Sequence, residues 1–460
     1  MINHRASTVE HENEHENENE DEEHQGRLAS YMAEHTKYLF FITTLPCGLR
    51  VITAPMPYME SVAIGVWAAV GGRYEAPAQS GISHFLEHLT FKGTRRRTAR
   101  QISLAIEGVG GTLNGFTGEE VTCYYAKVRY TRFTYALDVL LDMYRGSTFP
   151  LDEVERERRV IKEEIKMYLD VPQQVVYDDL NTTMWPGQPL GRALLGTFET
   201  VDAMRRSDIV AFHDAYYAPG TTVISVAGNV SHDAAVTAVA RALRREWKRQ
   251  AAPAYAPCTE RQRRPRIHLR QRQTEQAHLL IGLRSFGKLD PQRYALRLLS
   301  TVLGENMSSR LNHEIREKRG LAYDVDSSIT YFYDTGAMRI SAGTDVAAMP
   351  KTLKLTMGIC RDVLRNGVSS RELKHAKDYI RGHIALTLER TAEYMLWLGE
   401  SLLTTNSVMS VEDILAAYDA VTPDDIQRVA ARVFNNRNLS VAVVAPATDE
   451  RAVRDLATFE

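Results

Sequence analysis

Residues 149–165 read FPLDEVERERRVIKEEI, and residues 368–384 read VSSRELKHAKDYIRGHI. Both stretches combine a start signal, apolar residues at helical spacing and a terminal isoleucine, so each predicts an amphipathic helix. Aligning Glu153 with Glu372 superimposes the apolar positions of the two stretches at an offset of 219 residues. A helix repeated at this distance indicates that the chain contains two copies of one unit.

A second pair of stretches supports the duplication. Residues 207–230 (SDIVAFHDAYYAPGTTVISVAGNV) match residues 423–446 (PDDIQRVAARVFNNRNLSVAVVAP), with Asp208 over Asp425 at an offset of 217. Each stretch passes from a helical pattern to a continuous apolar run typical of a buried strand. The sequence therefore predicts an α+β fold made of two tandem homologous α/β domains, each an antiparallel-rich sheet packed by helices.

Composition excludes several classes of protein. The 460 residues are 44% hydrophobic and 25% charged, with a net charge of −2, which is typical of a globular chain longer than one domain. A net charge this small gives no reason to expect nucleic acid, and no apolar run is long enough to span a membrane. Four widely spaced cysteines and the absence of a secretory signal pattern predict a cytoplasmic protein with no membrane partner.

Changes in composition suggest where the domains begin and end. Residues 1–35 are rich in Glu, His and Asn and are predicted to be a disordered acidic tail. Residues 36–248 and 273–460 form the two predicted domains, separated by a linker at 249–272 that is rich in Pro and Arg. The basic linker could be a nucleic-acid patch, but no aromatic residues lie among its arginines as a stacking platform requires.

The first domain contains a pattern typical of a metal site. Residues 80–94 read SGISHFLEHLTFKGT, with Ser80 as the expected N-cap of a helix. A helix places His84 and His88 one turn apart on the same side, so both imidazoles can reach one metal ion. Glu87 beside them can act as the general base of metal-assisted peptide hydrolysis without being a ligand.

Spacing alone is weak evidence for such a site. Residues 11–15 (HENEH) have the same H-x-x-E-H spacing, but they lack an apolar stripe that would dock a helix. A catalytic zinc ion also needs a third protein ligand, which leaves the fourth position for water. The predicted helix at 152–170 (DEVERERRVIKEEIKMYLD) offers Glu157, Glu163 and Glu164, and spacing does not choose among them.

With these motifs, the chain resembles the zinc metallopeptidase family of pitrilysin, insulin-degrading enzyme and mitochondrial processing peptidase, and within it the short bacterial processing-peptidase-like branch. In that family a downstream helix supplies a Glu about 76 residues after the second His, which implies Glu164. The resemblance thus implies one Zn²⁺ per chain, held by His84, His88 and Glu164, with Glu87 as the catalytic base. It also implies that Glu157 does not bind the metal itself but supports the residues that do.

The resemblance extends to a substrate-binding strand. Residues 110–128 (GGTLNGFTGEEVTCYYAKV) are similar to the family's edge strand, in which Gly115 replaces the usual Ala. This similarity implies that Asn114, Gly115 and Phe116 bind substrate, with the peptide backbone added as a further strand. The alternative is an ordinary strand that follows a glycine turn.

In the second domain, residues 307–328 (MSSRLNHEIREKRGLAYDVDSS) resemble the family's other signature. The resemblance implies that Arg316 anchors the substrate backbone and that Tyr323 hydrogen-bonds the developing oxyanion, with Gly320 ending the helix between them. Without the family, Arg316 reads as a solvated helix residue and Tyr323 as a half-buried strand residue.

Together these features imply a zinc-dependent endopeptidase that hydrolyses peptides or unfolded segments in an enclosed chamber. Members of the short branch pair two chains, so we expect a homodimer, with a heterodimer containing a related subunit as the alternative. Two other functions stay open from the residues: a non-catalytic assembly or chaperone subunit, and a zinc hydrolase of a non-peptide amide. Metal analysis and substrate profiling would separate these functions.

Overall fold

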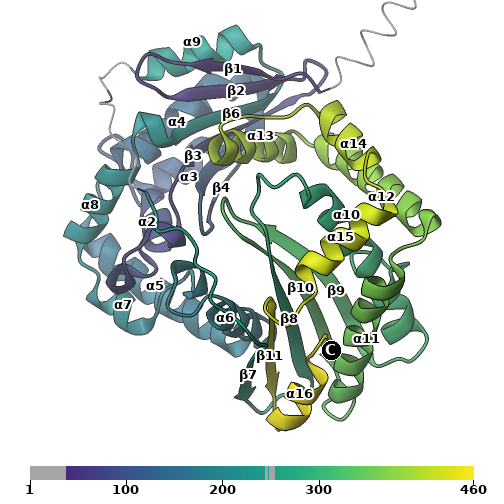
Figure 1. The fold of residues 1–460 in the computed structure, drawn as a ribbon. Coiled ribbons are helices and arrows are strands. Elements are labelled where there is room, and N and C mark those ends of the chain that lie inside the picture. Colours follow the sequence, from purple (N-terminus) through teal and green to yellow (C-terminus); the bar gives the residue numbers. More distant parts are fainter. Residues whose placement is uncertain (1–37, 244–246, 248–253, 460) are drawn as a thin grey trace, which may run out of the picture.

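The computed structural model describes residues 38–243, 247 and 254–459. These residues form two units, each a sheet covered by helices, as Figure 1 shows. The prediction of two tandem α+β units is therefore confirmed. The predicted disordered tail at 1–35, with its HENEH stretch, lies outside the described residues.

The first sheet has six strands in the order β1-β2-β6-β3-β5-β4. Its strands are β1 (Phe41–Thr44), β2 (Arg50–Pro55), β3 (Ser61–Ala68), β4 (Thr112–Thr117), β5 (Thr122–Arg129) and β6 (Thr222–Gly228). All neighbours pair antiparallel except β2 with β6, which are parallel. Because β4 pairs only with β5 within the described residues, β4 forms one edge of the sheet.

The second sheet repeats this topology with five strands in the order β7-β11-β8-β10-β9. Its strands are β7 (Arg266–Gln271), β8 (Ala277–Ser285), β9 (Ala322–Tyr331), β10 (Gly336–Thr344) and β11 (Leu439–Ala445). Again one pair is parallel, β7 with β11, and the others are antiparallel. The sheets match strand for strand once β1 is set aside, as duplication of one unit predicts.

The predicted linker at 249–272 is wrong at its C-terminal end, because residues 266–271 form β7. Ile267 and Leu269 alternate with polar residues and pack against the core of the second unit. Arg266 and Arg270 on either side, and His268 between them, hide this two-residue period in the sequence. The second unit therefore begins several residues before 273.

Helices cover both sheets. The first unit contains α2 (Ile82–Thr90), α3 (Ala99–Glu107), α4 (Phe133–Gly146), α5 (Leu151–Asp170), α6 (Pro172–Met184), α7 (Phe198–Ala203), α8 (Arg206–Tyr216) and α9 (His232–Ala242). The second contains α10 (Arg293–Leu303), α11 (Met349–Asn366), α12 (Ser370–Leu388), α13 (Thr391–Thr405), α14 (Val411–Asp419), α15 (Pro423–Val433) and α16 (Glu450–Leu456). In the described part of the chain every helix is too short or too polar to cross a membrane.

Two equivalent helices are exchanged between the units. Helix α6 packs on β8 and β11 of the second sheet, and α13 packs on β3 and β6 of the first. In each exchange the helix packs closely against a glycine of the sheet. A Cβ added to Gly65 would lie 2.5 Å from the sulfur of Met395 in α13, and a Cβ added to Gly282 would lie 2.6 Å from the sulfur of Met184 in α6. Each unit therefore depends on a helix from the other half for part of its core, and the two are interlocked rather than joined only by a linker.

Candidate metal centre

Helix α2 begins one residue later than its sequence predicts. Gly81, with φ of 91°, occupies the position expected for Ser80, and a Cβ at Gly81 would lie 2.6 Å from the carbonyl oxygen of Leu195. The carboxylate of Glu75 caps the helix instead, because it accepts the backbone N–H groups of Gly81 at 2.8 Å and Ser83 at 2.9 Å. Ser80 as N-cap is thus wrong, and this distant cap fixes the start of the helix that carries both histidines.

His84 and His88 converge with one carboxylate from α5. Their ring centroids are 4.6 Å apart, and Oε2 of Glu164 lies 3.6 Å from Nε2 of each histidine. One ligand atom from each residue lies within 4.8 Å of the others, and α2 packs beside α5 in Figure 1. Two imidazole nitrogens and one carboxylate oxygen suit a tetrahedral zinc ion whose fourth position stays open.

The structure distinguishes the three glutamates of α5 among which spacing could not choose the third ligand. Glu164 faces the histidines, whereas the carboxylate of Glu163 lies 2.6 Å from the ammonium of Lys166 on the exposed side of the helix. Glu157 lies one helical repeat before Glu164 and contacts His88 from behind. Each acid therefore has a different neighbour, and one of the three reaches both imidazoles.

The pKa values of the two histidines shift in opposite directions, because a hydrogen bond and carboxylate charges act on His88. Burial, together with the charge of His88, lowers the pKa of His84 to about 3, so this imidazole is neutral near pH 7 and able to bind a metal. Burial also disfavours the charged form of His88, but the hydrogen bond with Glu157 and the charges of Glu164 and Glu87 outweigh it and raise the His88 pKa. A positive charge is therefore favoured at His88, which a bound cation can provide in place of a proton.

Glu157 sets the orientation of His88. Its side chain is 3% exposed, with Oε2 at 3.1 Å from Nδ1 of His88 and Oε1 at 2.8 Å from Nζ of Lys92. Burial raises the Glu157 pKa, but the hydrogen bonds from His88 and Lys92 outweigh burial and lower it, so the carboxylate is ionised. An ionised carboxylate only accepts hydrogen bonds, so Nδ1 of His88 carries a proton, and Nε2, which faces Glu164, is the nitrogen available to a metal once it is deprotonated.

Glu87 is held by a residue that sequence reasoning did not include among the site residues. The hydroxyl of Thr117, the last residue of β4, donates to Oε2 of Glu87 at 2.7 Å. Burial raises the pKa of Glu87, and this hydrogen bond offsets only part of the effect. The two-residue period of a strand is a signal for Thr117, because it puts Gly115 and Thr117 on the face of β4 nearest α2.

The remaining predicted strand residues face the other way. The ring of Phe116 lies 5.7 Å from Trp67, on the sheet face that α13 covers, and Oδ1 of Asn114 accepts the N–H of Gly115 at 2.8 Å. A Cβ at Gly115 would lie 3.1 Å from the ring of Phe91, so glycine leaves room for this aromatic side chain. Near α2, β4 therefore offers its backbone edge rather than the side chains of Asn114 and Phe116.

Arg316 and Tyr323 contact each other but not the three residues of the metal centre. Arg316 lies in a widened helical turn of the π type (Asn312–Glu317), and its guanidinium carbon is 5.5 Å from the ring centroid of Tyr323. Gly320, with φ of 57°, ends this turn by donating its N–H to the carbonyl of Arg316 at 2.9 Å. Tyr323 is 81% exposed rather than half-buried. Within the described residues neither side chain contacts His84, His88 or Glu164.

The second unit does not repeat the metal centre. In the alignment of the two halves, His383 takes the place of Glu164, and its ring stacks on Tyr379 at a centroid distance of 6.0 Å. His84, His88 and Glu164 form the one group of three potential metal ligands within 38–243, 247 and 254–459. The copies therefore diverged at the position where the first unit gathers its ligands.

Comparison with known proteins adds independent information. The family model described as insulinase (peptidase family M16) matches residues 50–198, and the model described as peptidase M16 inactive domain matches residues 203–380. The chain belongs to peptidase family M16. The boundary between the two matches, at residues 198–203, lies within the first structural unit, before α8, β6 and α9, and the three potential metal ligands all lie in the first match.

Relatives of this M16 chain match it over most of its length. An uncharacterized zinc protease of Streptomyces coelicolor is 42% identical over 421 residues, which cover 90% of this chain and 91% of that protein. An uncharacterized zinc protease of Bacillus subtilis is 36% identical over 403 residues, or 87% and 96% of the two chains. The names of these relatives support a zinc peptidase at a coarse level.

A solved structure supports the M16 fold. The crystal structure of a protease from Helicobacter pylori superimposes with a TM-score of 0.84, at 22% sequence identity, over 89% of this chain and 100% of that one. At this identity the similarity shows the fold alone. The family resemblance predicted from the motifs is nevertheless confirmed by the family models and the relatives together.

Proposed function

We propose that this M16 chain is a zinc-dependent metalloendopeptidase that hydrolyses peptides or unfolded segments, with Glu87 as its general base. The observation that carries the proposal is the convergence of His84, His88 and Glu164, whose ligand atoms lie within 4.8 Å of one another. Glu87 projects from the same helix as both histidines, so its carboxylate lies next to this point. The names of the bacterial relatives agree with this chemistry.

The residues around the metal centre can carry out the individual steps of peptide hydrolysis. Zinc held by the three ligands would polarise a peptide carbonyl and make water a stronger acid. Glu87 accepts a proton from the attacking water and delivers it to the leaving amine, a role for which a carboxyl with a raised pKa is suited. Thr117 holds one oxygen of Glu87 and leaves the other for the water.

Substrate would bind along the edge of β4 as an additional strand. In the described part of the chain this edge has no partner, and Asn114, Gly115 and Phe116 provide its central backbone groups. Binding through the backbone depends on an extended substrate conformation more than on the identity of its side chains. It therefore favours unfolded segments over folded proteins.

Arg316 and Tyr323 are proposed to complete substrate binding from the second unit. Arg316 anchors the substrate backbone, and the Tyr323 hydroxyl donates to the oxyanion that forms at the scissile carbonyl. The 81% exposure of Tyr323 supports this role, because an aromatic side chain left this exposed is available to a ligand. Reaching the metal centre requires the units to close or a substrate to bridge them.

We also propose a homodimer that encloses a chamber, with a heterodimer as the alternative, and a cytoplasmic location. The four cysteines, Cys47, Cys123, Cys258 and Cys360, are all free thiols, which supports a reducing compartment. Light scattering of the purified chain, with and without its co-expressed genomic neighbours, would distinguish one kind of subunit from two.

The decisive test is Glu87→Gln. The amide retains an oxygen for the Thr117 hydroxyl but takes up no proton, so the variant should keep its zinc and lose nearly all cleavage of a quenched peptide library. Undiminished cleavage by Glu87→Gln would remove Glu87 from the mechanism. A zinc-loaded wild-type chain that leaves the whole library intact would reject the peptidase, and assays with non-peptide amides would then follow.

A further inference from the structure

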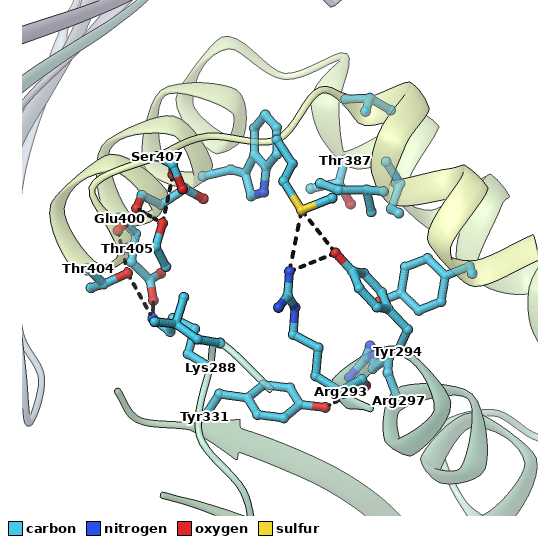
Figure 2. A pocket seen from close by; sticks show the side chains of 18 of the residues that line it. Lys288, Arg293, Tyr294, Arg297, Tyr331, Thr387, Glu400, Thr404, Thr405 and Ser407 are labelled. Atoms are coloured by element: carbon cyan, nitrogen blue, oxygen red, sulfur yellow. Dashed lines mark hydrogen bonds and ion pairs between the residues drawn. The ribbon is translucent and has the colours of Figure 1, made fainter. Parts of the chain in front are cut away.

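A pocket of about 440 Å³ opens in the second unit where α10, α12, α13 and α14 meet (Figure 2). None of His84, His88 and Glu164 lines it, so it is separate from the metal centre. One side of the pocket is apolar and is formed by Ile384, Leu388, Trp397, Val411 and Ile414. This volume lies in the range of roughly 300–1,000 Å³ that is usual for small-molecule sites.

The opposite side carries an excess of positive charge. Lys288, Arg293 and Arg297 line it, against the single carboxylate of Glu400. Lys288 pairs with Glu400 at 2.9 Å, and Arg297 pairs at 2.8 Å with Glu305. Arg293 forms no ion pair with any carboxylate in the part of the chain that the structure describes. One positive charge in the pocket is therefore left without an anion.

The unpaired guanidinium is held in place by its neighbours. Nη2 of Arg293 donates to the hydroxyl of Tyr294 at 2.7 Å and lies 3.4 Å from the sulfur of Met409. The guanidinium carbon sits 4.5 Å from the ring centroid of Tyr294, and that ring packs edge-on against Tyr418 at 5.1 Å. Figure 2 shows Arg293 reaching into the middle of the pocket from its α10 wall. These contacts leave Nη1 and Nε available to a ligand.

We propose that this pocket binds a molecule with one carboxylate on an apolar body. The carboxylate accepts a hydrogen bond from Nη1 or Nε of Arg293 and pairs with its positive charge, and the apolar body lies against the wall around Trp397. A small, fully polar anion would leave that wall in contact with water. A neutral apolar molecule would leave the charge of Arg293 without a partner.

The position of the pocket predicts a structural effect of binding. Helix α13, which supplies Trp397 and Glu400, is the exchanged helix that packs on the first sheet, whereas Arg293 belongs to α10 of the second unit. A ligand that contacts both Arg293 and Trp397 therefore connects α10 to the helix of the second unit that packs on the first sheet. Binding should raise the melting temperature of the full chain, because the ligand is bound by the folded state alone.

The test is calorimetric titration of the full chain with decanoate, decan-1-ol and N-acetyl-leucyl-leucine. Decanoate should bind at least about tenfold more tightly than decan-1-ol, and Arg293→Gln should weaken decanoate binding about tenfold or more, as loss of a charge-assisted hydrogen bond does. If the dipeptide binds and decanoate does not, the same carboxylate chemistry holds and its source is a peptide C-terminus.

Two further variants make the result specific. Met409→Glu places a carboxylate beside Arg293 and should abolish binding without removing the arginine. Arg129→Gln, at a side chain that is 65% exposed on β5, is the matched control and should change nothing. Circular dichroism checks that each variant is folded. Equal affinity for decanoate and decan-1-ol, unchanged binding by Arg293→Gln, or no binding of either carboxylate would overturn the proposal.

Discussion

The carboxylate of Glu157 accepts a hydrogen bond from Nδ1 of His88 at 3.1 Å, while its other oxygen lies 2.8 Å from Nζ of Lys92. This arrangement presents Nε2 of His88 toward Glu164 and keeps the imidazole in one tautomer. Lys92 lies four residues after His88, just beyond the end of α2, so one short stretch of chain supplies both the ligand and the cation that pairs with Glu157. The orientation of His88 thus depends on an ion pair buried behind the metal centre.

Glu157→Gln should lower zinc affinity about 10- to 100-fold, which is the usual effect of removing a group that orients a ligand. The amide has nearly the same volume, so packing is preserved while the negative charge is lost. Competition with a chromogenic chelator measures the affinity. Glu155→Gln, on the same helix with a side chain that is 58% exposed, is the control. Equal zinc affinity in both variants would show that Glu157 does not support His88.

Glu164→Ala should remove bound zinc and leave the fold intact. The side chain of Glu164 is 39% exposed, and its ion-pair contacts are with the two histidines, so its loss removes one of three ligands without disturbing the core. The neighbouring Glu163→Ala is the matched control, because its carboxylate pairs with Lys166. Elemental analysis of the purified variants gives the zinc content. Full zinc in Glu164→Ala would exclude Glu164 as a ligand.

Thr117→Val should reduce kcat about tenfold with little change in zinc content, because Glu87 loses a hydrogen bond that holds its carboxylate. Thr117→Ser keeps the hydroxyl and should retain most of the activity. Steady-state cleavage of a peptide by the wild type and both variants makes the comparison. If Thr117→Ser loses as much activity as Thr117→Val, retaining the hydroxyl does not preserve activity, and the hydrogen bond to Glu87 is not what sets kcat.

The parts of the fold that could be predicted from the sequence are those that produce a recognisable pattern within a short stretch of residues. The helices containing Glu153 and Glu372, and the strands that follow them, show their apolar period and end signals within about 20 residues. The exchange of α6 and α13 has no such signal, because a helix facing its own sheet and one facing the other sheet have the same apolar stripe. Only the three-dimensional packing over Gly65 and Gly282 reveals it.

The same limit applies to the candidate site. His84 and His88 are one turn apart on one helix, so local geometry already brings them together. Glu164 lies 76 residues beyond His88, and spacing alone does not distinguish it from Glu157 and Glu163. The family resemblance is what selects Glu164 as the third ligand. The cap provided by Glu75 depends on a loop that returns to the helix start, which no spacing rule describes. The roles of Arg316 and Tyr323 stay predictions.

Stability should depend on pH through Glu372, at the start of α12. The hydrogen bond from Arg310 and the helix-cap contacts with Ser369 outweigh burial and lower the Glu372 pKa from 4.5 to about 2. A carboxyl whose pKa is lower in the folded state stabilises the fold above its unfolded pKa, and this contribution disappears as pH falls from about 4.5 to about 2. Glu372→Gln should therefore lower the free energy of unfolding by about 1–2 kcal/mol at pH 7.

The difference between wild type and Glu372→Gln should be nearly the same in urea unfolding at pH 7 and pH 5 and clearly smaller at pH 3.5, because the contribution of the carboxylate is lost only below its unfolded pKa of about 4.5. Glu107→Gln removes an exposed acid at the end of α3 that forms no ion pair among the described residues, and it controls for the loss of one surface charge. A constant difference across these three pH values would mean that Glu372 acts through packing or hydrogen bonds that do not depend on its charge, and that its contact with Arg310 does not stabilise the second unit electrostatically.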